Sequence, residues 1–227
     1  MKKRIVGIDP SLSCTAVVIM EDGKDDVLHC FTTKNTKWVK AIETIATCHL
    51  TSYRTDKGEN SEVEINKLTD YRRNAYQVVD TLNLTKDDHV FIESYASRAK
   101  GNIIDLVVFS TFIRERILDS GAELTIVTPM SLKKTWAEAI YPLDKKGVAR
   151  NYELSPNTKG EMLGVAGGSF KKHQMMLGLY EMKETSIFKK EMEMHRLDIM
   201  PLKDIPTPFN DFVDAYAAAY LGKNGKL

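Results

Sequence analysis

Four acidic residues stand where buried strands or a helix could hold them for chemistry. Asp9 ends the apolar run at residues 5–8, and Glu93 ends a second apolar run. Asp211 and Asp214 lie three residues apart near the C-terminus, a spacing that puts both on one face of a helix, one turn apart. If the two strands are neighbours and the helix crosses their ends, the four carboxylates converge.

Four carboxylates cannot share a site of low dielectric constant unless protons or a cation neutralise them. Oxygen ligands without cysteine or clustered histidine select hard cations, Mg²⁺ or Mn²⁺. Two such ions roughly 3.5–4 Å apart promote phosphodiester hydrolysis, because one activates water and the other stabilises the leaving oxygen. Each acid taken alone also fits an ordinary role as a turn former, an exposed loop acid or a helix N-terminal acid. The prediction therefore depends on the four acids occurring together.

The elements that would position these acids follow from periodicity and turn residues. An antiparallel meander is expected first, with a turn at Asp22-Gly23 between its second and third strands. Strand–helix alternation then resumes, so the sequence predicts an α/β sheet with mixed strand direction. The expected strands are 3–9, 13–20, 27–33, 89–92 and 123–127; the expected helices are 38–50, 64–82, 102–118, 130–140, 169–184 and 209–221; and residues 51–61 and 141–168 are expected to be loops.

Composition bounds the class of protein. The chain has 227 residues, 43% hydrophobic and 28% charged, as in a soluble globular domain. No apolar stretch approaches the 18 or so residues of a membrane span, and the basic opening lacks the apolar region of a signal peptide. The three cysteines are widely spaced and odd in number, which argues against a disulfide framework or a cysteine zinc site. We therefore expect a cytoplasmic protein with no membrane partner.

The charges are nearly balanced, with 32 basic residues against 31 acidic ones, but they are unevenly distributed. Residues 133–172 hold eight basic and four acidic side chains, and further basic residues follow Glu93. Positive charge near the acidic site is what contacts to DNA phosphates require. The candidates for such contacts are Arg98, Lys100, Lys133, Lys134, Lys171 and Lys172. The glycine-rich residues 164–172 do not fit a nucleotide-binding P-loop, because Phe170 and Lys172 occupy its glycine and Ser/Thr positions, so no nucleotide cofactor is expected.

These segments together resemble the RuvC-type Holliday junction resolvases. Residues 7–16 are similar to the family's Gly-Ile-Asp-Pro-Gly turn, with Ser11 and Ala16 where that pattern has glycine. Residues 91–93, Phe-Ile-Glu, resemble the second acidic motif of the family. Residues 168–174 resemble its Gly-Ser-x-x-Lys helix start, and residues 211–219 its closing Asp-x-x-Asp-Ala-x-Ala.

The resemblance implies an RNase H-like α/β fold, a mixed five-stranded sheet whose first three strands are antiparallel, flanked by helices. It implies one domain over residues 1–227, with insertions near 35–65, 141–168 and 185–205. It also implies a homodimer formed through the helix at 102–118, which is apolar nearly all round. Such a dimer would cut four-way DNA junctions by symmetrical paired incisions.

Residue by residue, the resemblance makes Asp9, Glu93, Asp211 and Asp214 the ligands of two Mg²⁺ ions per site, for which Mn²⁺ can substitute. Lys172 becomes a basic residue near the scissile phosphate. Tyr95 is the near match, offset by one position, for an aromatic residue that helps to open the junction.

Three other functions remain open from the residues. The first is an RNase H-like nuclease that acts on RNA–DNA hybrids, flaps or other branched DNA. The second is an actin-like or sugar-kinase-like ATP-binding domain, which also opens with Gly-x-Asp but needs a second related subdomain and further glycine-rich loops. The third is a non-catalytic DNA-binding protein, against which the four acids argue, because a binder gains nothing from carboxylates that face phosphates.

Overall fold

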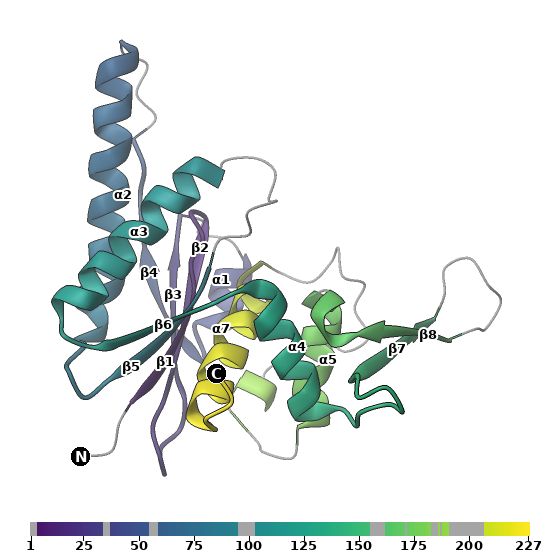
Figure 1. The fold of residues 1–227 in the computed structure, drawn as a ribbon. Coiled ribbons are helices and arrows are strands. Elements are labelled where there is room, and N and C mark those ends of the chain that lie inside the picture. The colour runs from purple at the N-terminus through teal and green to yellow at the C-terminus, as the bar shows by residue number, and fades with distance from the viewer. Residues whose placement is uncertain are drawn as a thin grey trace.

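The computed structural model describes residues 4–33, 37–54, 59–94, 103–154, 162–170, 172–182, 186, 188–190 and 207–227 of the chain (Figure 1). The elements, in chain order, are β1 (Ile5–Asp9), β2 (Cys14–Met20), β3 (Val27–Thr32), α1 (Lys37–Ile42), β4 (Ala46–Leu50), α2 (Asn60–Leu82), β5 (His89–Glu93), α3 (Ile103–Asp119), β6 (Glu123–Val127), α4 (Pro129–Ile140), β7 (Arg150–Leu154), β8 (Met162–Ala166), the short 3₁₀ turn η1 (Gly167–Ser169), α5 (Lys172–Glu181) and α7 (Thr207–Lys223).

The main sheet has six strands in the order β4-β3-β2-β1-β5-β6. Strands β1, β2 and β3 form the predicted antiparallel meander, and β5 and β6 continue the sheet parallel to β1. The predicted α/β fold, a mixed sheet that opens with three antiparallel strands and is flanked by helices, is confirmed. The sheet has one strand more than predicted, because β4 pairs in parallel with β3 at the edge.

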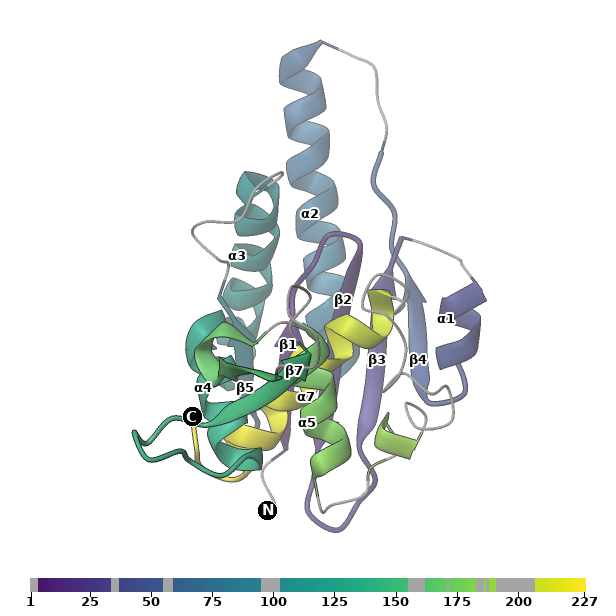
Figure 2. The same cartoon turned by 90° about the vertical axis from the view of Figure 1, so that its right-hand side faces the viewer.

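Two segments differ from the prediction. Residues 38–50 were expected to form one helix, but they divide into the short helix α1 and the edge strand β4, which lie side by side (Figure 2). Residues 141–168 were expected to be a loop, but β7 and β8 pair there as an antiparallel hairpin. This hairpin is a separate two-stranded sheet that projects away from the main sheet (Figure 1). The glycine and lysine residues of this stretch are typical of a loop, so the sequence did not indicate the pairing of the two strands.

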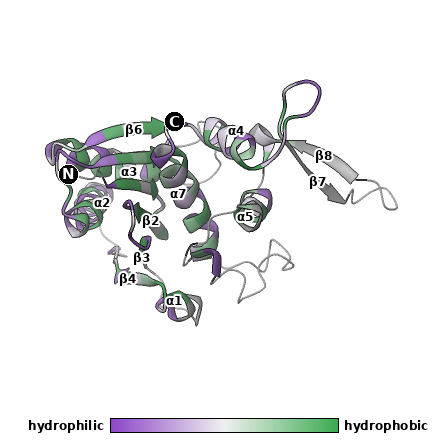
Figure 3. Cartoon of the chain, turned by 90° about the horizontal axis from the view of Figure 1, so that it is seen from below, coloured by the Kyte–Doolittle hydropathy of each residue, from purple (hydrophilic) through white to green (hydrophobic). Residues whose placement is uncertain are grey.

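Helices cover both faces of the main sheet, and the alternation of side chains along a strand decides which residues face which layer. Val6 and Ile8 of β1 pack in the cluster formed with α2 and α3. The residues between and after them, Gly7 and Asp9, therefore face α7 on the opposite side, where Phe91 of β5 also packs. Figure 3 shows α2 and α3 on one side of the strands and α7, α4 and α5 on the other.

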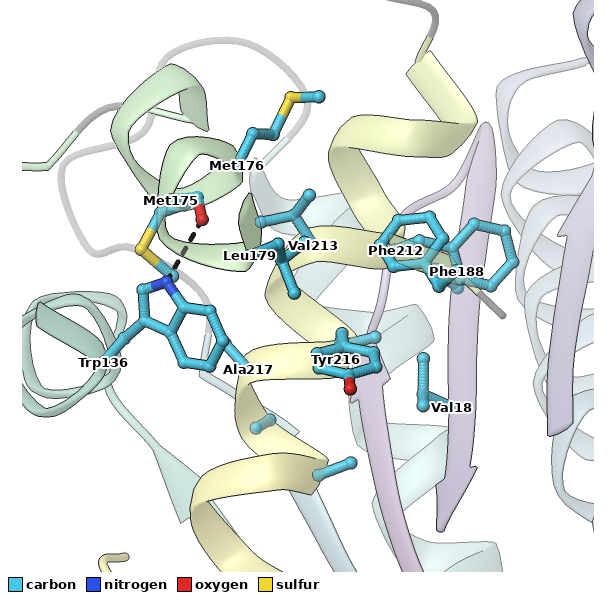
Figure 4. Close-up of a cluster of buried hydrophobic side chains, with 14 of the residues drawn as sticks. Val18, Trp136, Met175, Met176, Leu179, Phe188, Phe212, Val213, Tyr216 and Ala217 are labelled. Atoms are coloured by element: carbon cyan, nitrogen blue, oxygen red, sulfur yellow. Dashed lines mark hydrogen bonds between the residues drawn. The ribbon is translucent and has the colours of Figure 1, made fainter. Parts of the chain in front are cut away.

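The α7 side of the core depends on aromatic side chains (Figure 4). Phe188 stacks among Phe209, Phe212 and Tyr216, with ring centroids 5.7–6.4 Å apart. Trp136 of α4 is fully buried, and its indole N–H donates a 3.1 Å hydrogen bond to the carbonyl oxygen of Met175 in α5. The Trp136 bond thus joins α4 to α5, and the same indole packs edge-on against Tyr220 of α7, the helix that carries two of the predicted acids.

The last helix lies unusually close to the first strand. A Cβ on Gly7 would overlap the carbonyl oxygen of Ala215 and lie 2.7 Å from the backbone nitrogen of Ala219. Gly222, one turn further, leaves room for the ring of Phe91. Glycine and alanine therefore let the backbone of α7 approach β1 directly. This close approach determines how near the acidic side chains of α7 lie to the end of β1.

Two histidines lie at the edge of the sheet on the α2 side. His29 of β3 and His49 of β4 share a hydrogen bond of 3.1 Å between Nδ1 and Nε2, and both rings stack with Phe31. Burial lowers the pKa of His29, helped by its proximity to His49, and burial also lowers the pKa of His49. Both rings are thus held neutral in the folded protein at pH values where a free histidine begins to take up a proton.

This pair makes stability depend on pH. Because the folded pKa values lie below the unfolded value of about 6.5, the unfolded chain binds protons that the folded chain does not as the pH falls. We expect the free energy of unfolding, measured by urea titration, to decrease from pH 7.5 to pH 5.5. The variant His49→Gln should show a shallower decrease. An identical slope in the variant would contradict the assignment to this pair.

None of the helices in the described residues has the length and hydropathy needed to cross a membrane.

Candidate active site

The first two acids meet because their strands are parallel neighbours. Asp9 is the last residue of β1 and Glu93 the last residue of β5, and Ile8 is directly opposite Ile92 in the register. Side-chain alternation turns both acids towards α7 rather than α2. The two carboxylates therefore lie side by side at one end of the sheet.

Helix α7 supplies the third acid. One carboxylate oxygen from each of Asp9, Glu93 and Asp214 lies within 4.8 Å of the other two. Asp214 immediately precedes Ala215, whose backbone packs on Gly7, so the close approach of α7 to β1 is what brings its carboxylate to the strand ends. Three segments that are far apart in the sequence thus meet at one point.

The three carboxylates are largely buried, so the repulsion between their negative charges is strong. Asp214 is 3% exposed, Asp9 is 8% exposed, and Glu93 is half-buried. A pair of unit charges about 4 Å apart repels by about 4 kcal/mol at an effective dielectric constant of about 20. Three ionised carboxylates at this separation therefore need compensation by protons or by a bound cation.

The donor set fits a hard divalent cation. All three ligands are carboxylate oxygens, the donors that Mg²⁺ and Mn²⁺ prefer. Mg²⁺ holds its oxygens at about 2.1 Å, so opposite ligands are about 4.2 Å apart. Oxygens within 4.8 Å of one another need only small side-chain movements to reach that geometry. Asp9, Glu93 and Asp214 are therefore the residues that would hold a metal ion.

Asp211 differs from the other three predicted acids. It lies on α7 one turn before Asp214 and is half-buried. Among the described residues, the group with mutual distances within 4.8 Å comprises Asp9, Glu93 and Asp214 and does not include it. The structure thus brings three of the four acids together, and a role for Asp211 as a ligand stays a prediction.

Hydroxyl groups build the turn that follows Asp9. Thr15 Oγ1 donates a 2.8 Å hydrogen bond to the carbonyl oxygen of Ser11 and accepts one of 3.2 Å from the Ser11 N–H. Thr32 Oγ1 donates to the carbonyl oxygen of Ser13 at 2.9 Å. Thr15 and Thr32 are both almost fully buried. These bonds hold the turn in a sequence that has Ser11 where the resembled motif has glycine.

Arg114 is a residue near the site that the sequence did not indicate. Its Nη2 donates a 3.4 Å hydrogen bond to the carbonyl oxygen of Glu93. The N–H of Ser94 donates to the carbonyl oxygen of Val127 at 2.7 Å, so the chain is held on both sides of the strand end. The signal that could have identified it is its spacing, because Arg114 lies one turn after Ser110 and shares the helix face of the buried residues Ser110 and Ile117.

The predicted basic residues are described only in part. Lys133 is half-buried and Lys134 is exposed on α4, where Lys134 lies 3.8 Å from Glu138. Lys172 is the first residue of α5. Tyr95, Arg98, Lys100 and Lys171 lie outside the described residues. Contacts of these residues with DNA phosphates stay predictions.

The turn before α5 packs closely on α4. A Cβ on Gly167 would lie 2.5 Å from the Cβ of Ala137 and 3.3 Å from the backbone of Lys134. Helix α5 therefore begins beside the part of α4 that carries the predicted basic pair. Ser169, at which this helix was expected to begin, instead ends η1, and α5 begins three residues later.

No protein-family model matches the chain, and no curated protein sequence matches it. Among solved structures, Thermus thermophilus RuvC is similar at 13% identity and a TM-score of 0.48, covering 98% of this chain and 97% of that one. T. thermophilus RuvC in complex with a Holliday junction substrate gives 10% identity, a TM-score of 0.44, and coverage of 99% and 97%.

The yeast mitochondrial Holliday junction resolvase Ydc2 is similar at 11% identity and a TM-score of 0.45, covering 96% of this chain and 77% of that chain. The chain is similar over nearly its whole length to RuvC and Ydc2, the kind of protein that its motifs resemble.

Proposed function

We propose that this chain is a divalent-metal-dependent endonuclease that resolves four-way DNA junctions by paired phosphodiester hydrolysis. The observation that carries the proposal is the convergence of the Asp9, Glu93 and Asp214 carboxylates at the ends of two adjacent strands. A buried group made only of carboxylates is suited to hold Mg²⁺ against a phosphodiester, and unsuited to bind an anion by itself.

Different residues of the proposed site bind the metal, position the strand end and contact the phosphate backbone. Asp9, Glu93 and Asp214 hold the metal, and Asp211 is the candidate for an additional ligand when two ions are bound. Two bound Mg²⁺ or Mn²⁺ ions supply an activated water and stabilisation of the leaving oxygen. Arg114 positions the end of β5 through the Glu93 carbonyl. Lys172 at the start of α5, with the predicted basic residues of α4, orients the phosphate backbone.

The decisive experiment compares substrates. Purified protein with Mg²⁺ is incubated with an end-labelled synthetic four-way junction, a three-way junction, a flap, a linear duplex and an RNA–DNA hybrid. We expect symmetrical nicks in two opposing strands of the four-way junction and none without metal. Broad cutting of branched DNA, or cutting of the hybrid alone, would contradict junction resolution. Either result would support the alternative RNase H-like nuclease.

Paired incision requires two active sites, and α3 provides a surface by which two copies can associate. Its buried residues Phe109, Ile113 and Ile117 face the core. On another side of the same helix, Ile104 and Leu118 are 76% and 62% exposed. A twofold dimer through this face would give two sites related by the symmetry of the junction.

The molar mass of the protein in solution tests whether it forms this dimer. Light scattering during size-exclusion chromatography should give twice the chain mass of 25.7 kDa. The variant Ile104→Asp places a charge on the proposed interface and should elute as a monomer, whereas Ser131→Asp, at an exposed position on α4, should stay dimeric. A wild-type protein that is monomeric at micromolar concentration would rule out this interface.

A further inference from the structure

Three cysteines form a row across adjacent strands at the edge of the sheet. Cys30 of β3 is directly opposite Cys48 of β4 in the parallel register. Cys14 of β2 lies on the other side, with its Sγ 3.3 Å from the Sγ of Cys30. All three contribute to the hydrophobic cluster on the α7 side of the sheet. The row was not apparent from the sequence, where the three residues are widely spaced.

The three thiols differ in access and in acidity. Cys14 and Cys30 are 2% and 0% exposed, whereas Cys48 is half-buried on an edge strand. The interaction with the Cys30 side chain lowers the pKa of Cys48, although burial opposes the shift. Its interactions with Cys14 and then Cys48 raise the pKa of Cys30. Cys48 is therefore the thiol that an oxidant reaches first, and it ionises more readily than Cys30.

We propose that Cys48 and Cys30 form an oxidisable thiol pair, in which a peroxide oxidises Cys48 and Cys30 then closes a disulfide with it. Neighbouring strands lie about 4.8 Å apart, so residues directly opposite each other fall within the Cα separation of about 4.4–6.8 Å that a disulfide spans. The pairing of Cys30 with Cys48 thus requires side-chain rotation rather than movement of the strands.

Cys14 is the less suitable partner despite its sulfur contact. In the antiparallel register Cys14 is opposite Thr32, and Cys30 is opposite Ala16, so the two cysteines are diagonal neighbours. Diagonal positions on adjacent strands have Cα atoms about 7–8 Å apart, beyond the usual range of a disulfide. Cys14 therefore stays a free thiol.

The chemistry proceeds in two balanced steps. The Cys48 thiolate attacks one oxygen of hydrogen peroxide, the O–O bond breaks, and Cys48 sulfenic acid forms with release of hydroxide, which takes up the proton lost from the thiol. The Cys30 sulfur then attacks the Cys48 sulfur, the S–O bond breaks, and the departing hydroxide takes up the proton of the Cys30 thiol, so the disulfide forms with release of a second water. The net change consumes two thiols and one peroxide and yields one disulfide and two waters.

Tryptic peptides allow the pair to be identified directly. Cleavage after basic residues places Cys14, Cys30 and Cys48 on the separate peptides 5–24, 25–34 and 41–54. The folded full-length protein is treated with hydrogen peroxide, its remaining thiols are alkylated under denaturing conditions, and it is digested without reductant. We expect alkylatable thiols to fall from three to one, with peptide 25–34 linked to peptide 41–54.

Single variants assign the roles, with circular dichroism to establish that each is folded. Cys14→Ala should still form the 30–48 linkage and lose both of its thiols. Cys48→Ala should form no disulfide, and Cys30→Ala should show Cys48 carrying added oxygen. Retention of all three thiols in the wild type, a 14–30 linkage, or disulfide formation in Cys48→Ala would overturn the proposal. None of these measurements depends on nuclease activity.

Discussion

Replacing Asp214 by asparagine is expected to abolish cleavage, whereas replacing Asp211 by asparagine is expected to leave measurable activity. Asp214 shares the carboxylate group with Asp9 and Glu93, all within 4.8 Å of one another. The amide keeps the size of the side chain but loses the charge that holds a divalent ion. Losing several kcal/mol of transition-state stabilisation, at 1.36 kcal/mol per factor of ten, corresponds to a rate decrease of about 10³-fold or more.

The Asp211→Asn variant is the matched control, because it makes the same chemical change one turn away on the same helix. Because Asp211 lies outside the close group of three carboxylates, we expect this additional ligand to contribute less than Asp214, with a decrease of about 10- to 100-fold. Single-turnover cleavage of a four-way junction by the two variants measures the difference. An Asp211→Asn enzyme as inactive as Asp214→Asn would show that Asp211 is a ligand of equal importance.

Thermal unfolding distinguishes a lost ligand from a damaged fold. Without metal, Asp214→Asn should be at least as stable as the wild type, because it removes repulsion among three carboxylates. Added Mn²⁺ should raise the midpoint of the wild type but not of the variant, since a ligand stabilises only the form that binds it. Four-way junction binding, measured by gel retardation, should be retained. A variant that unfolds early even without metal would contradict this explanation.

The second large effect is expected at Gly7. Gly7→Ala introduces a Cβ that overlaps the carbonyl oxygen of Ala215 and lies 2.7 Å from the backbone nitrogen of Ala219. Because both neighbours are backbone atoms, rotation of a side chain cannot relieve the clash, and α7 must move. We expect a loss of about 3 kcal/mol or more in the free energy of unfolding, with loss of cleavage as Asp214 is displaced.

Two comparison variants test this cause. Gly225→Ala adds a Cβ with no atom within 4 Å, at a φ of +62°, and should cost only about 1 kcal/mol, from backbone strain. The double variant Gly7→Ala/Ala219→Gly removes the Ala219 Cβ, 3.0 Å from the new atom, but neither backbone contact, so it should stay destabilised. Recovery to wild-type stability in urea titrations would show that the obstruction is a side chain.

Much of the site was predictable because it depends on local patterns. Apolar runs that end in Asp9 and Glu93 identify buried strands, and the alternation along each strand places both acids on one face. The selection of Asp214 over Asp211 was not predictable. Three residues along a helix correspond to about 60° of rotation and 4.5 Å of rise, so which acid points at the strand ends depends on the depth and rotation of α7.

Strand β4 and the β7–β8 hairpin were both predicted wrongly because their local sequence does not distinguish a strand from another structure. Strand β4 is short and half-exposed, so its pattern is compatible with either a helix or a strand until it pairs with β3. The strands β7 and β8 pair with each other in a sheet separate from the main one, in a stretch rich in glycine and lysine that is typical of a loop. The contact of Arg114 with the Glu93 carbonyl was not predictable either, because it depends on how α3 crosses the end of β5.

The packing of α7 against β1 has a consequence for synthesis. A ribosome makes β1 first and α7 last, and domains generally fold as their segments emerge. The carboxylates of Asp9 and Glu93 are therefore joined by that of Asp214 only after α7 has left the ribosome. Nascent chains that end before α7 lack the third carboxylate, so the proposed metal site is incomplete until this helix has been made.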